Sequence, residues 1–300
     1  MAENLISVVD FIRTFRKNPD YGLAFLDMHG RLETILGTEP YPEIKPSIKE
    51  ISRSQLWCYE HDKDIPLSVQ AIERLEKVGV LFPLTMESHL LENLVYLYTI
   101  VLLSGDITKN YYVRFNLDQR IATGVINRLS PFSVKRTKGE NKYDLAEADT
   151  SFGRVLHLIG LPIATAKVTP EYQDNCLDIL LKVSDDRRLL NAVCNGFLLT
   201  KLTITTEKRR GYERLYLHSQ SDEEKAKRFV SKIVLLMQKF IPEIEFPFII
   251  GEKEVDTKNG REKRYIPYSY VNKRKIEALI NSQNISPETR EVLNNSHITS

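Results

Sequence analysis

The sequence predicts an α+β fold built from two similar halves, and three observations support this prediction. Of the 300 residues, 42% are apolar, which is enough for one large or two smaller hydrophobic cores. Residues 86–284 contain the same order of elements twice: an apolar helix, a β-hairpin, an amphipathic helix, a second hairpin and a closing helix. The two apolar helices run from Leu90 to Leu103 and from Leu189 to Leu199. A repeated half-unit of this size predicts a pseudo-two-fold, αββαββα-type tandem architecture in a single chain.

The first repeat follows this order from residue 85 to residue 162. A Gly105-Asp106 turn is expected after the apolar helix, and Gly139-Glu140-Asn141 has the composition of a hairpin turn. The elements expected after the helix are a strand 111–115, a helix capped by Asp118, strands 132–138 and 142–149, and a closing helix 152–159.

The second repeat is expected over residues 186–284. Asn259-Gly260 is the strongest hairpin signal in the chain, and the run from Ser221 to Glu224 has the form of a helix capping box. The elements expected are strands 202–205 and 213–218, a helix from Ser221, strands 246–255 and 262–270, and a helix 272–281. Each half would place helices on one face of an antiparallel sheet and leave the other face open.

The remaining segments are assigned by composition. Residues 1–84 should form a small helical domain, and they carry 10 Lys/Arg against 13 Asp/Glu, whereas the rest of the chain has a net charge of +5. Within this domain we expect a helix opened by Ser52, a helix from Leu67 to Lys77 ended by Gly79, and Trp57 in the core. Residues 163–185 are expected to be a connector, and residues 285–300 a frayed C-terminal tail.

Composition also limits the classes of function. Cys58, Cys176 and Cys194 lack metal-ligand spacing and are expected to be reduced thiols in a cytoplasmic protein. No run of 18 apolar residues is present and the first four residues are not typical of a signal peptide, so no membrane association is expected. No cofactor and no small-molecule ligand are expected.

Three segments resemble the LAGLIDADG homing endonuclease family, and the repeated pattern to which they belong resembles it over about two-thirds of the chain. Leu94 to Ile107 (LVYLYTIVLLSGDI) parallels the first signature helix and its Gly-Asp-Gly-Ser-Ile end, and Leu190 to Phe197 (LNAVCNGF) parallels the second. Arg154 to Pro162 (RVLHLIGLP) is typical of the helix that closes the first half. The resemblance implies two signature helices paired at a pseudo-dyad, with Gly196 at their contact, and two sheets forming a DNA-binding saddle.

The resemblance also implies where catalytic acids would lie. In this family each signature helix delivers one carboxylate to divalent cations, because Mg²⁺ prefers oxygen ligands. Without gaps, the two positions are occupied here by Ser104 and Lys201. Asp106 is the acid that could replace Ser104. We therefore expect DNA binding without double-strand cleavage and without a metal, and Mg²⁺ only if a residual endonuclease or nickase activity remains.

A second, shorter resemblance covers Ile51 to Val80. The run Ser-Arg-Ser-Gln-Leu from Ser52, followed by Ile65-Pro66-Leu67 and a helix, is similar to the latter part of a phage-repressor-type helix-turn-helix. This resemblance implies that Arg53, Ser54 and Gln55 face the major groove. Pro46 departs from the pattern, because it lies where the preceding helix should run.

The candidate DNA-binding residues on the hairpins are basic or polar and occur in both repeats. They are Arg114, Asn116, Lys135, Arg136, Lys138 and Lys142 in the first half, and Lys208, Arg209, Arg210, Arg214, Lys258, Arg261, Lys263 and Arg264 in the second. Such a set predicts a phosphate-binding surface. The sequence thus predicts a double-stranded DNA-binding protein that acts as a regulator or as a replication or architectural factor in the nucleoid. Structured RNA, bound as by an intron maturase, is the alternative ligand, and a protein adaptor is a further alternative.

Overall fold

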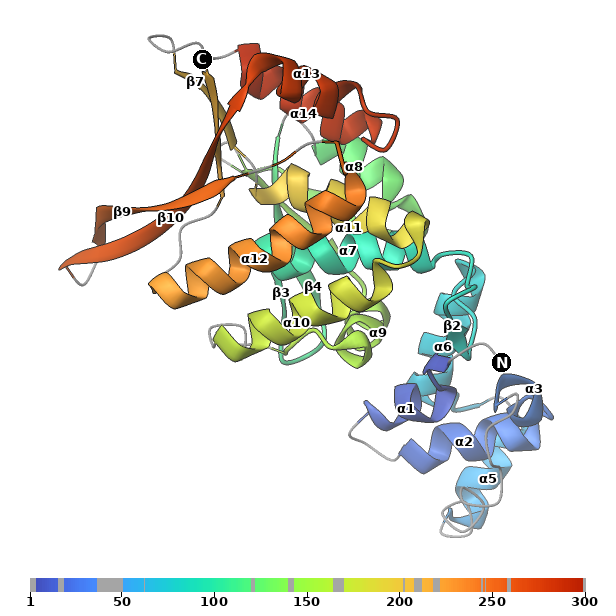
Figure 1. The fold of residues 1–300 in the computed structure, drawn as a ribbon. Coiled ribbons are helices and arrows are strands. Elements are labelled where there is room, and N and C mark those ends of the chain that lie inside the picture. Colours follow the sequence, from blue (N-terminus) through green and yellow to red (C-terminus); the bar gives the residue numbers. More distant parts are fainter. Residues whose placement is uncertain are drawn as a thin grey trace.

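The computed structural model describes residues 4–15, 19–36, 51–61, 63–119, 122–139, 143–163, 170–201, 203–207, 212–217, 222–243, 245, 247–257 and 260–298. Within these ranges the chain folds into a helical N-terminal unit followed by two helix-and-sheet repeats (Figure 1). None of the helices in these ranges is long and apolar enough to cross a lipid bilayer.

The first repeat forms an antiparallel sheet in the spatial order β3-β4-β6-β5. Its elements are α7 (Leu91–Ser104), β3 (Gly105–Ile107), β4 (Val113–Asp118), α8 (Ala122–Arg128), the 3-10 turn η2 (Ser130–Phe132), β5 (Lys135–Thr137), β6 (Tyr143–Ala148) and α9 (Thr150–Ile159). Where a turn was expected at Gly105-Asp106, the chain instead forms the short strand β3 paired with β4.

The second repeat has the spatial order β7-β8-β10-β9, so that in both repeats the strands lie in the order first, second, fourth, third. Its elements are α11 (Arg187–Lys201), β7 (Thr203–Glu207), β8 (Tyr212–Tyr216), α12 (Glu223–Phe240), β9 (Phe248–Thr257), β10 (Gly260–Asn272) and α13 (Lys273–Asn281). The predicted α+β class and the predicted αββαββα repetition are both confirmed.

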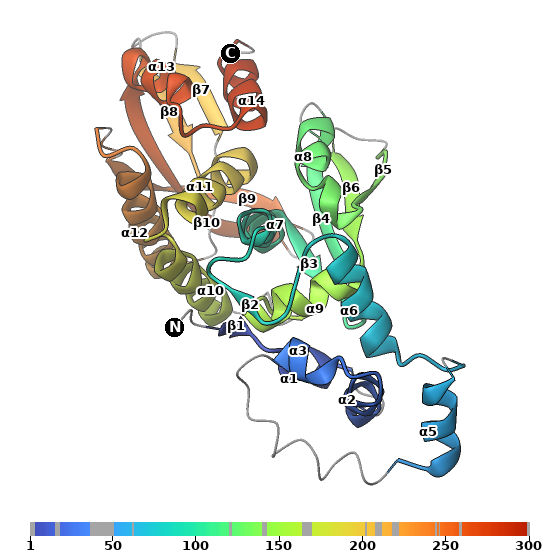
Figure 2. The same cartoon turned by 90° about the vertical axis from the view of Figure 1, so that its right-hand side faces the viewer.

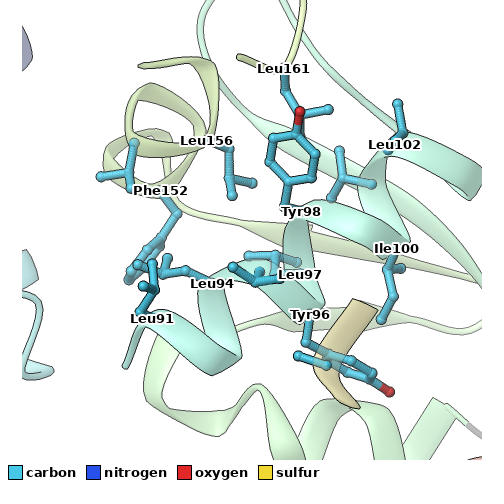
Figure 3. Close-up of a cluster of buried hydrophobic side chains, with 14 of the residues drawn as sticks. Leu91, Leu94, Tyr96, Leu97, Tyr98, Ile100, Leu102, Phe152, Leu156 and Leu161 are labelled. Atoms are coloured by element: carbon cyan, nitrogen blue, oxygen red, sulfur yellow. The ribbon is translucent and has the colours of Figure 1, made fainter. Parts of the chain in front are cut away.

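The helix α7 lies at the centre of the molecule and is buried along nearly its whole length. Its sequence is apolar on every side, which is the pattern of a helix surrounded by protein. One side of α7, with Leu91 and Leu94, packs against Phe152 and Leu156 of α9 (Figure 3). Another side packs against α11, so that the first helices of the two repeats contact each other.

The sheet of the first repeat is two-sided. Along β4, Val113, Phe115 and Leu117 are buried, whereas Arg114 and Asn116 are exposed. This alternation buries one face under the helices and leaves the other face open, as the sequence predicted.

The N-terminal unit is closed by the pairing of its own ends. Strand β1 (Asn4–Ile6) pairs with β2 (Leu84–Thr85) just before α7 begins. The helices between them are α1 (Val8–Arg13), α2 (Pro19–Met28), α3 (Leu32–Leu36), α5 (Arg53–Glu60) and α6 (Leu67–Lys77). The unit contacts the first repeat through α1, α6 and β1, all of which pack on α9 (Figure 2).

Two segments are more structured than the sequence indicated. The expected connector contains α10 (Pro170–Val183), which packs on α7 and α12. The expected tail contains α14 (Pro287–Ile298), which packs on α11 and α8 and buries Leu293 and Thr289. The prediction of a frayed tail was wrong because α14 is held by contacts with distant elements, and local sequence does not report these.

Two local predictions also need correction. Trp57 was expected in the core, but it is 46% exposed. Its ring stacks on His61, with 4.4 Å between the ring centroids, and lies under the Lys63 ammonium. The helix α12 is capped by Asp222, whose carboxylate accepts a hydrogen bond from the Lys225 amide at 3.0 Å. Ser221, the expected cap, lies outside the described residues.

Candidate nucleic-acid interface

The centre of the candidate interface is the contact between α7 and α11. A Cβ atom on Gly196 would lie 3.0 Å from the Cβ of Thr99 and 3.4 Å from the carbonyl oxygen of Tyr96. The absence of a side chain at residue 196 lets the two backbones approach closely. The prediction that Gly196 lies at the contact of the two helices is confirmed.

The positions that correspond to metal-binding acids lie at the C-terminal ends of these helices. Ser104 is the last residue of α7, and its hydroxyl donates a hydrogen bond to the Ile100 carbonyl at 2.9 Å. Lys201 is the last residue of α11. Asp106 is exposed on β3, opposite Arg114 of β4. In the part of the chain that the structure describes, no three His, Cys, Asp or Glu side chains gather as a metal site would require.

A row of charged side chains crosses the open face of the first sheet. The strand register places Asp106, Arg114, Glu147 and Lys135 side by side on β3, β4, β6 and β5. The signs alternate across this row, and Arg114 Nε lies 2.9 Å from Glu147 Oε1. Because both partners are well exposed, this ion pair contributes little stability and can exchange for another anion.

The neighbouring row on the same face is uncharged. It consists of Asn116, Leu145 and Thr137, and Tyr143 lies one row further along β6. Leu145 is 36% exposed and Tyr143 is 47% exposed, so apolar surface lies open beside the amide of Asn116. An amide, a hydroxyl and apolar groups in one row can contact base edges and thymine methyl groups.

Arg136 has a different environment from the other candidate residues. Its guanidinium forms an ion pair with the fully buried Asp144 and donates a hydrogen bond to the Thr123 hydroxyl at 3.1 Å. Burial by itself would raise the pKa of Asp144, but hydrogen bonds from the Gly139 amide and Arg136 outweigh it and the pKa is lowered. Arg136 is thus held by a buried anion and does not lie free on the open face.

The hairpin of β9 and β10 carries as many acids as bases among its described residues. Arg261 lies 3.3 Å from Asp256, Lys263 lies 2.9 Å from Glu252, and Arg264 lies 2.7 Å from Glu262, each distance joining nitrogen to oxygen. The sequence prediction of a basic hairpin considered the bases without the acids on the same hairpin. This hairpin is a balanced set of exposed ion pairs.

The other candidate residues are placed as follows. Lys135 and Lys138 are exposed, and neither forms an ion pair with another described residue. Arg214 pairs through its backbone with Tyr270 and Thr205. Outside the described residues lie Lys142, Lys208, Arg209, Arg210 and Lys258.

The helix-turn-helix resemblance corresponds to α5 and α6. The cap of α5 is Ser52, whose hydroxyl accepts a hydrogen bond from the Gln55 amide at 3.3 Å. Arg53 and Ser54 are exposed, whereas the Gln55 side chain donates a hydrogen bond to Asp64 at 3.0 Å. The segment that would hold the preceding helix, residues 37–50, lies outside the described residues. Figure 1 places α5 and the β9–β10 hairpin at opposite ends of the molecule, so they do not form one continuous surface.

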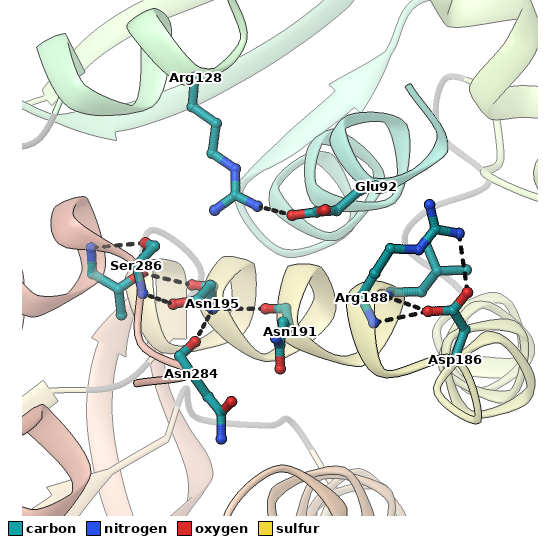
Figure 4. Close-up of polar contacts among 10 residues, drawn as sticks. Glu92, Arg128, Asp186, Arg188, Asn191, Asn195, Asn284 and Ser286 are labelled. Atoms are coloured by element: carbon teal, nitrogen blue, oxygen red, sulfur yellow. Dashed lines mark hydrogen bonds and ion pairs between the residues drawn. The ribbon is translucent and has the colours of Figure 1, made fainter. Parts of the chain in front are cut away.

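The central helices are braced by polar contacts that the sequence analysis missed. The Asn195 amide on α11 donates to the Asn284 carbonyl at 2.8 Å and accepts from the Ser286 amide at 2.7 Å (Figure 4). Glu92 of α7 forms an ion pair with Arg128 of α8 at 3.0 Å. An asparagine inside an apolar helix is the only sequence signal for the first contact, and it does not identify the partner.

Comparisons with known proteins find likeness only at the level of structure. No protein-family model and no curated protein matches the chain. The N-terminal LAGLIDADG domain of DUF199/WhiA matches with a TM-score of 0.33 and 13% identity, over 70% of this chain and 88% of that one. Full-length DUF199/WhiA from Thermatoga maritima matches with a TM-score of 0.36 and 15% identity, over 77% of this chain and 65% of that one.

The observations on this chain define the class of fold. Two repeats share one strand order, and their first helices meet at a glycine in the centre of the molecule. The chain therefore has a LAGLIDADG-like α+β fold, as its sequence resemblance implied.

Proposed function

We propose that this chain binds a specific site in double-stranded DNA through the open faces of its two sheets, and that it does not cut the DNA. The observation that carries the proposal is the open face of β3, β4, β6 and β5, where Arg114, Asn116 and Lys135 project beside one another. A pseudo-two-fold arrangement of such faces suits a duplex site with its own two-fold symmetry. Regulation of transcription and an architectural or replication role at the nucleoid are the functions that this proposal includes.

The balanced charges on these faces indicate how binding would work. An exposed ion pair such as Arg114–Glu147 contributes about 0–1 kcal/mol, so that the guanidinium can turn to a phosphate or a guanine at little cost. Because Arg114, Arg261 and Lys263 already have acidic partners among the described residues, we expect base contacts to supply much of the affinity.

The absence of cleavage is proposed from the two helix ends. The Ser104 hydroxyl already donates a hydrogen bond to the Ile100 carbonyl of its own helix, and a lysine stands at the end of α11. Neither residue is a good ligand for Mg²⁺. The test is incubation of supercoiled plasmid with Mg²⁺ or Mn²⁺, with wild-type protein and with Asp106→Asn. No conversion by either protein supports the proposal. Nicking by wild-type protein that is lost in Asp106→Asn would identify a residual nickase.

Structured RNA is the second candidate ligand, favoured by the exposed apolar surface at Tyr143 and Leu145. Aromatic side chains on an open sheet can stack on unpaired bases. Direct competition between a structured intron RNA and a pool of duplex DNA discriminates the two candidates. Retention of the RNA against excess duplex would replace the DNA proposal with an RNA one.

The experiment for DNA binding itself is an electrophoretic mobility shift with a random duplex pool at low salt. The proposal predicts retarded complexes whose bound fraction falls as salt is raised. If no duplex in the pool is retarded at low salt, the proposal is wrong.

A further inference from the structure

A pocket of about 590 Å³ lies between the N-terminal unit and the first repeat. Thr14, Phe15 and Tyr59 line it from the N-terminal unit, and Lys109, Tyr111 and Arg154 line it from the repeat. The volume is within the range of small-molecule sites. About half of the lining residues are polar, and one of them is an acid, Asp64, whose carboxylate accepts a hydrogen bond from the Gln55 side chain at 3.0 Å.

Arg154 is the most unusual residue of this pocket. Its guanidinium lies between two aromatic rings, 3.7 Å from the centre of the Phe15 ring and 4.1 Å from that of Tyr111. One of its terminal nitrogens donates to the carbonyl oxygen of Thr14 at 2.6 Å and to its hydroxyl at 3.0 Å. Its Nε is buried without a hydrogen-bond partner, and no described carboxylate forms an ion pair with it.

Half-burying this cation is energetically unfavourable, because protein replaces the water that would solvate it, and the charge of Asp149 offsets this cost only in part. Burial accordingly lowers the pKa of Arg154. An anion in the pocket would add a closer negative charge at the remaining terminal nitrogen, because guanidinium nitrogens bind carboxylate and phosphate oxygens well. Lys109, which is exposed at the same pocket, adds a second positive charge.

The turn that carries Lys109 is fixed in shape. The Tyr111 amide donates to the Thr108 carbonyl at 2.9 Å, and the Thr108 amide donates to the Tyr112 carbonyl at 2.9 Å. Tyr111 has a φ of 64°, which is uncommon for a residue with a side chain, and its carbonyl lies against Gly153 of α9. This turn joins β3 to β4, so that the pocket is built on the same hairpin that presents Asp106 and Arg114 on the open face.

We propose that this pocket binds a small organic anion, with its carboxylate or phosphate at Arg154 and Lys109 and an apolar or aromatic body against the aromatic walls. Such a ligand contacts both the N-terminal unit and the β3–β4 turn, and therefore holds the two parts together. Because it binds only the folded chain, it raises the midpoint temperature of unfolding.

The test uses the full chain, without DNA, and four probes. Phenyl phosphate and benzoate each combine an anionic group with a ring and distinguish the two head groups, inorganic phosphate lacks the ring, and benzyl alcohol lacks the charge. Calorimetric titration is expected to show one-to-one binding of phenyl phosphate or benzoate, with weaker binding of the two incomplete probes. The midpoint temperature of unfolding should rise most with the ring-bearing anion that binds and less with the two incomplete probes.

Two charge-reversal variants locate the binding. Lys109→Glu places an acid at the pocket, and the matched control Lys182→Glu reverses an exposed lysine on α10. We expect the affinity for the bound probe to fall roughly tenfold in Lys109→Glu, about the effect of one charge-assisted contact, and to be unchanged in Lys182→Glu. No binding of either ring-bearing anion at millimolar concentration would overturn the proposal. Equal affinities of the two variants, or inorganic phosphate binding as tightly as phenyl phosphate, would overturn it as well.

Discussion

Gly196 of α11 faces Thr99 of α7 in a tight contact: a Cβ atom on residue 196 would lie 3.0 Å from the Thr99 Cβ, so that Thr99 would have to shift. The Thr99 hydroxyl donates to the Val95 carbonyl at 2.9 Å, so it places no unsatisfied polar group at this contact. This pair is therefore a point of close approach between the first helices of the two repeats.

The first prediction concerns this contact. Gly196→Leu should lower the free energy of unfolding by about 1–3 kcal/mol, because the added side chain must displace Thr99 or the α7 backbone. Urea denaturation measures the change. The matched control is Ala278→Leu on the exposed side of α13, which should change stability by less than about 0.5 kcal/mol. A Gly196→Leu protein as stable as wild type would contradict the close contact.

The second prediction concerns the attachment of α14. Asn195→Ala removes the partners of the Ser286 amide and the Asn284 carbonyl, and each buried group left without a partner costs about 1–3 kcal/mol. Hydrogen exchange should become faster for the amides of α14, whereas the exposed substitution Asn294→Ala should leave them unchanged. Unchanged exchange in Asn195→Ala would mean that this asparagine does not hold the helix.

The third prediction concerns pH. Because the pKa of Asp144 is lowered in the folded chain, its carboxylate contributes stability above the unfolded pKa of about 3.9, and this contribution is lost as the pH falls through the folded pKa. The difference in unfolding free energy between wild type and Asp144→Asn should therefore be largest above about pH 4 and narrow below it. Urea denaturation between about pH 3 and 7 measures this difference. The exposed Asp256→Asn serves as the control, and its difference from wild type should stay small throughout. A constant difference for Asp144→Asn would contradict the prediction.

The fourth prediction concerns phosphate contact by Lys135. This exposed lysine forms no ion pair with another described residue, so its ammonium is free to contact a phosphate. Lys135→Ala should weaken binding to all duplex sequences alike and reduce the slope of log affinity against log salt by about 1. Lys182→Ala, on α10, is the control and should keep the wild-type slope. An unchanged slope in Lys135→Ala would exclude this contact.

The fifth prediction concerns base contact by Asn116. An asparagine amide can bond both N6 and N7 of adenine in the major groove, which discriminates against other bases by about 1–3 kcal/mol. Asn116→Ala should therefore relax the preference at one position of the selected site and leave the salt slope unchanged. Competition binding with single-base variants of the site measures this, and an unaltered preference at every position would contradict it.

Local sequence patterns predicted the framework of the fold. The apolar run of α7 exceeds what a surface helix carries, and the Asn259-Gly260 sequence signal predicted the hairpin in which β9 pairs with β10. Pro66 and Gly79 bound α6 where the sequence indicated, and Gly79 has the positive φ of 88° that a helix C-terminus favours. The signals that predict these elements lie within the elements themselves or within a few residues of their ends.

The features that the sequence did not predict depend on contacts between distant segments. The segment before α14 is bonded to Asn195, about ninety residues earlier, and Trp57 lies exposed on α5, stacked on His61. The acids opposite Arg114 and Lys263 become partners only through the strand register. The anion pocket combines residues near positions 15, 59, 110 and 154, which no single motif contains.

The central claim is that two related open faces read one duplex site. Selection of bound fragments from a random duplex pool, followed by sequencing and footprinting, tests it most directly. The claim predicts one enriched, near-palindromic site that is protected over roughly two helical turns, about 20 base pairs. Recovery of fragments with no shared sequence, or of a single half-site without its symmetric partner, would contradict it.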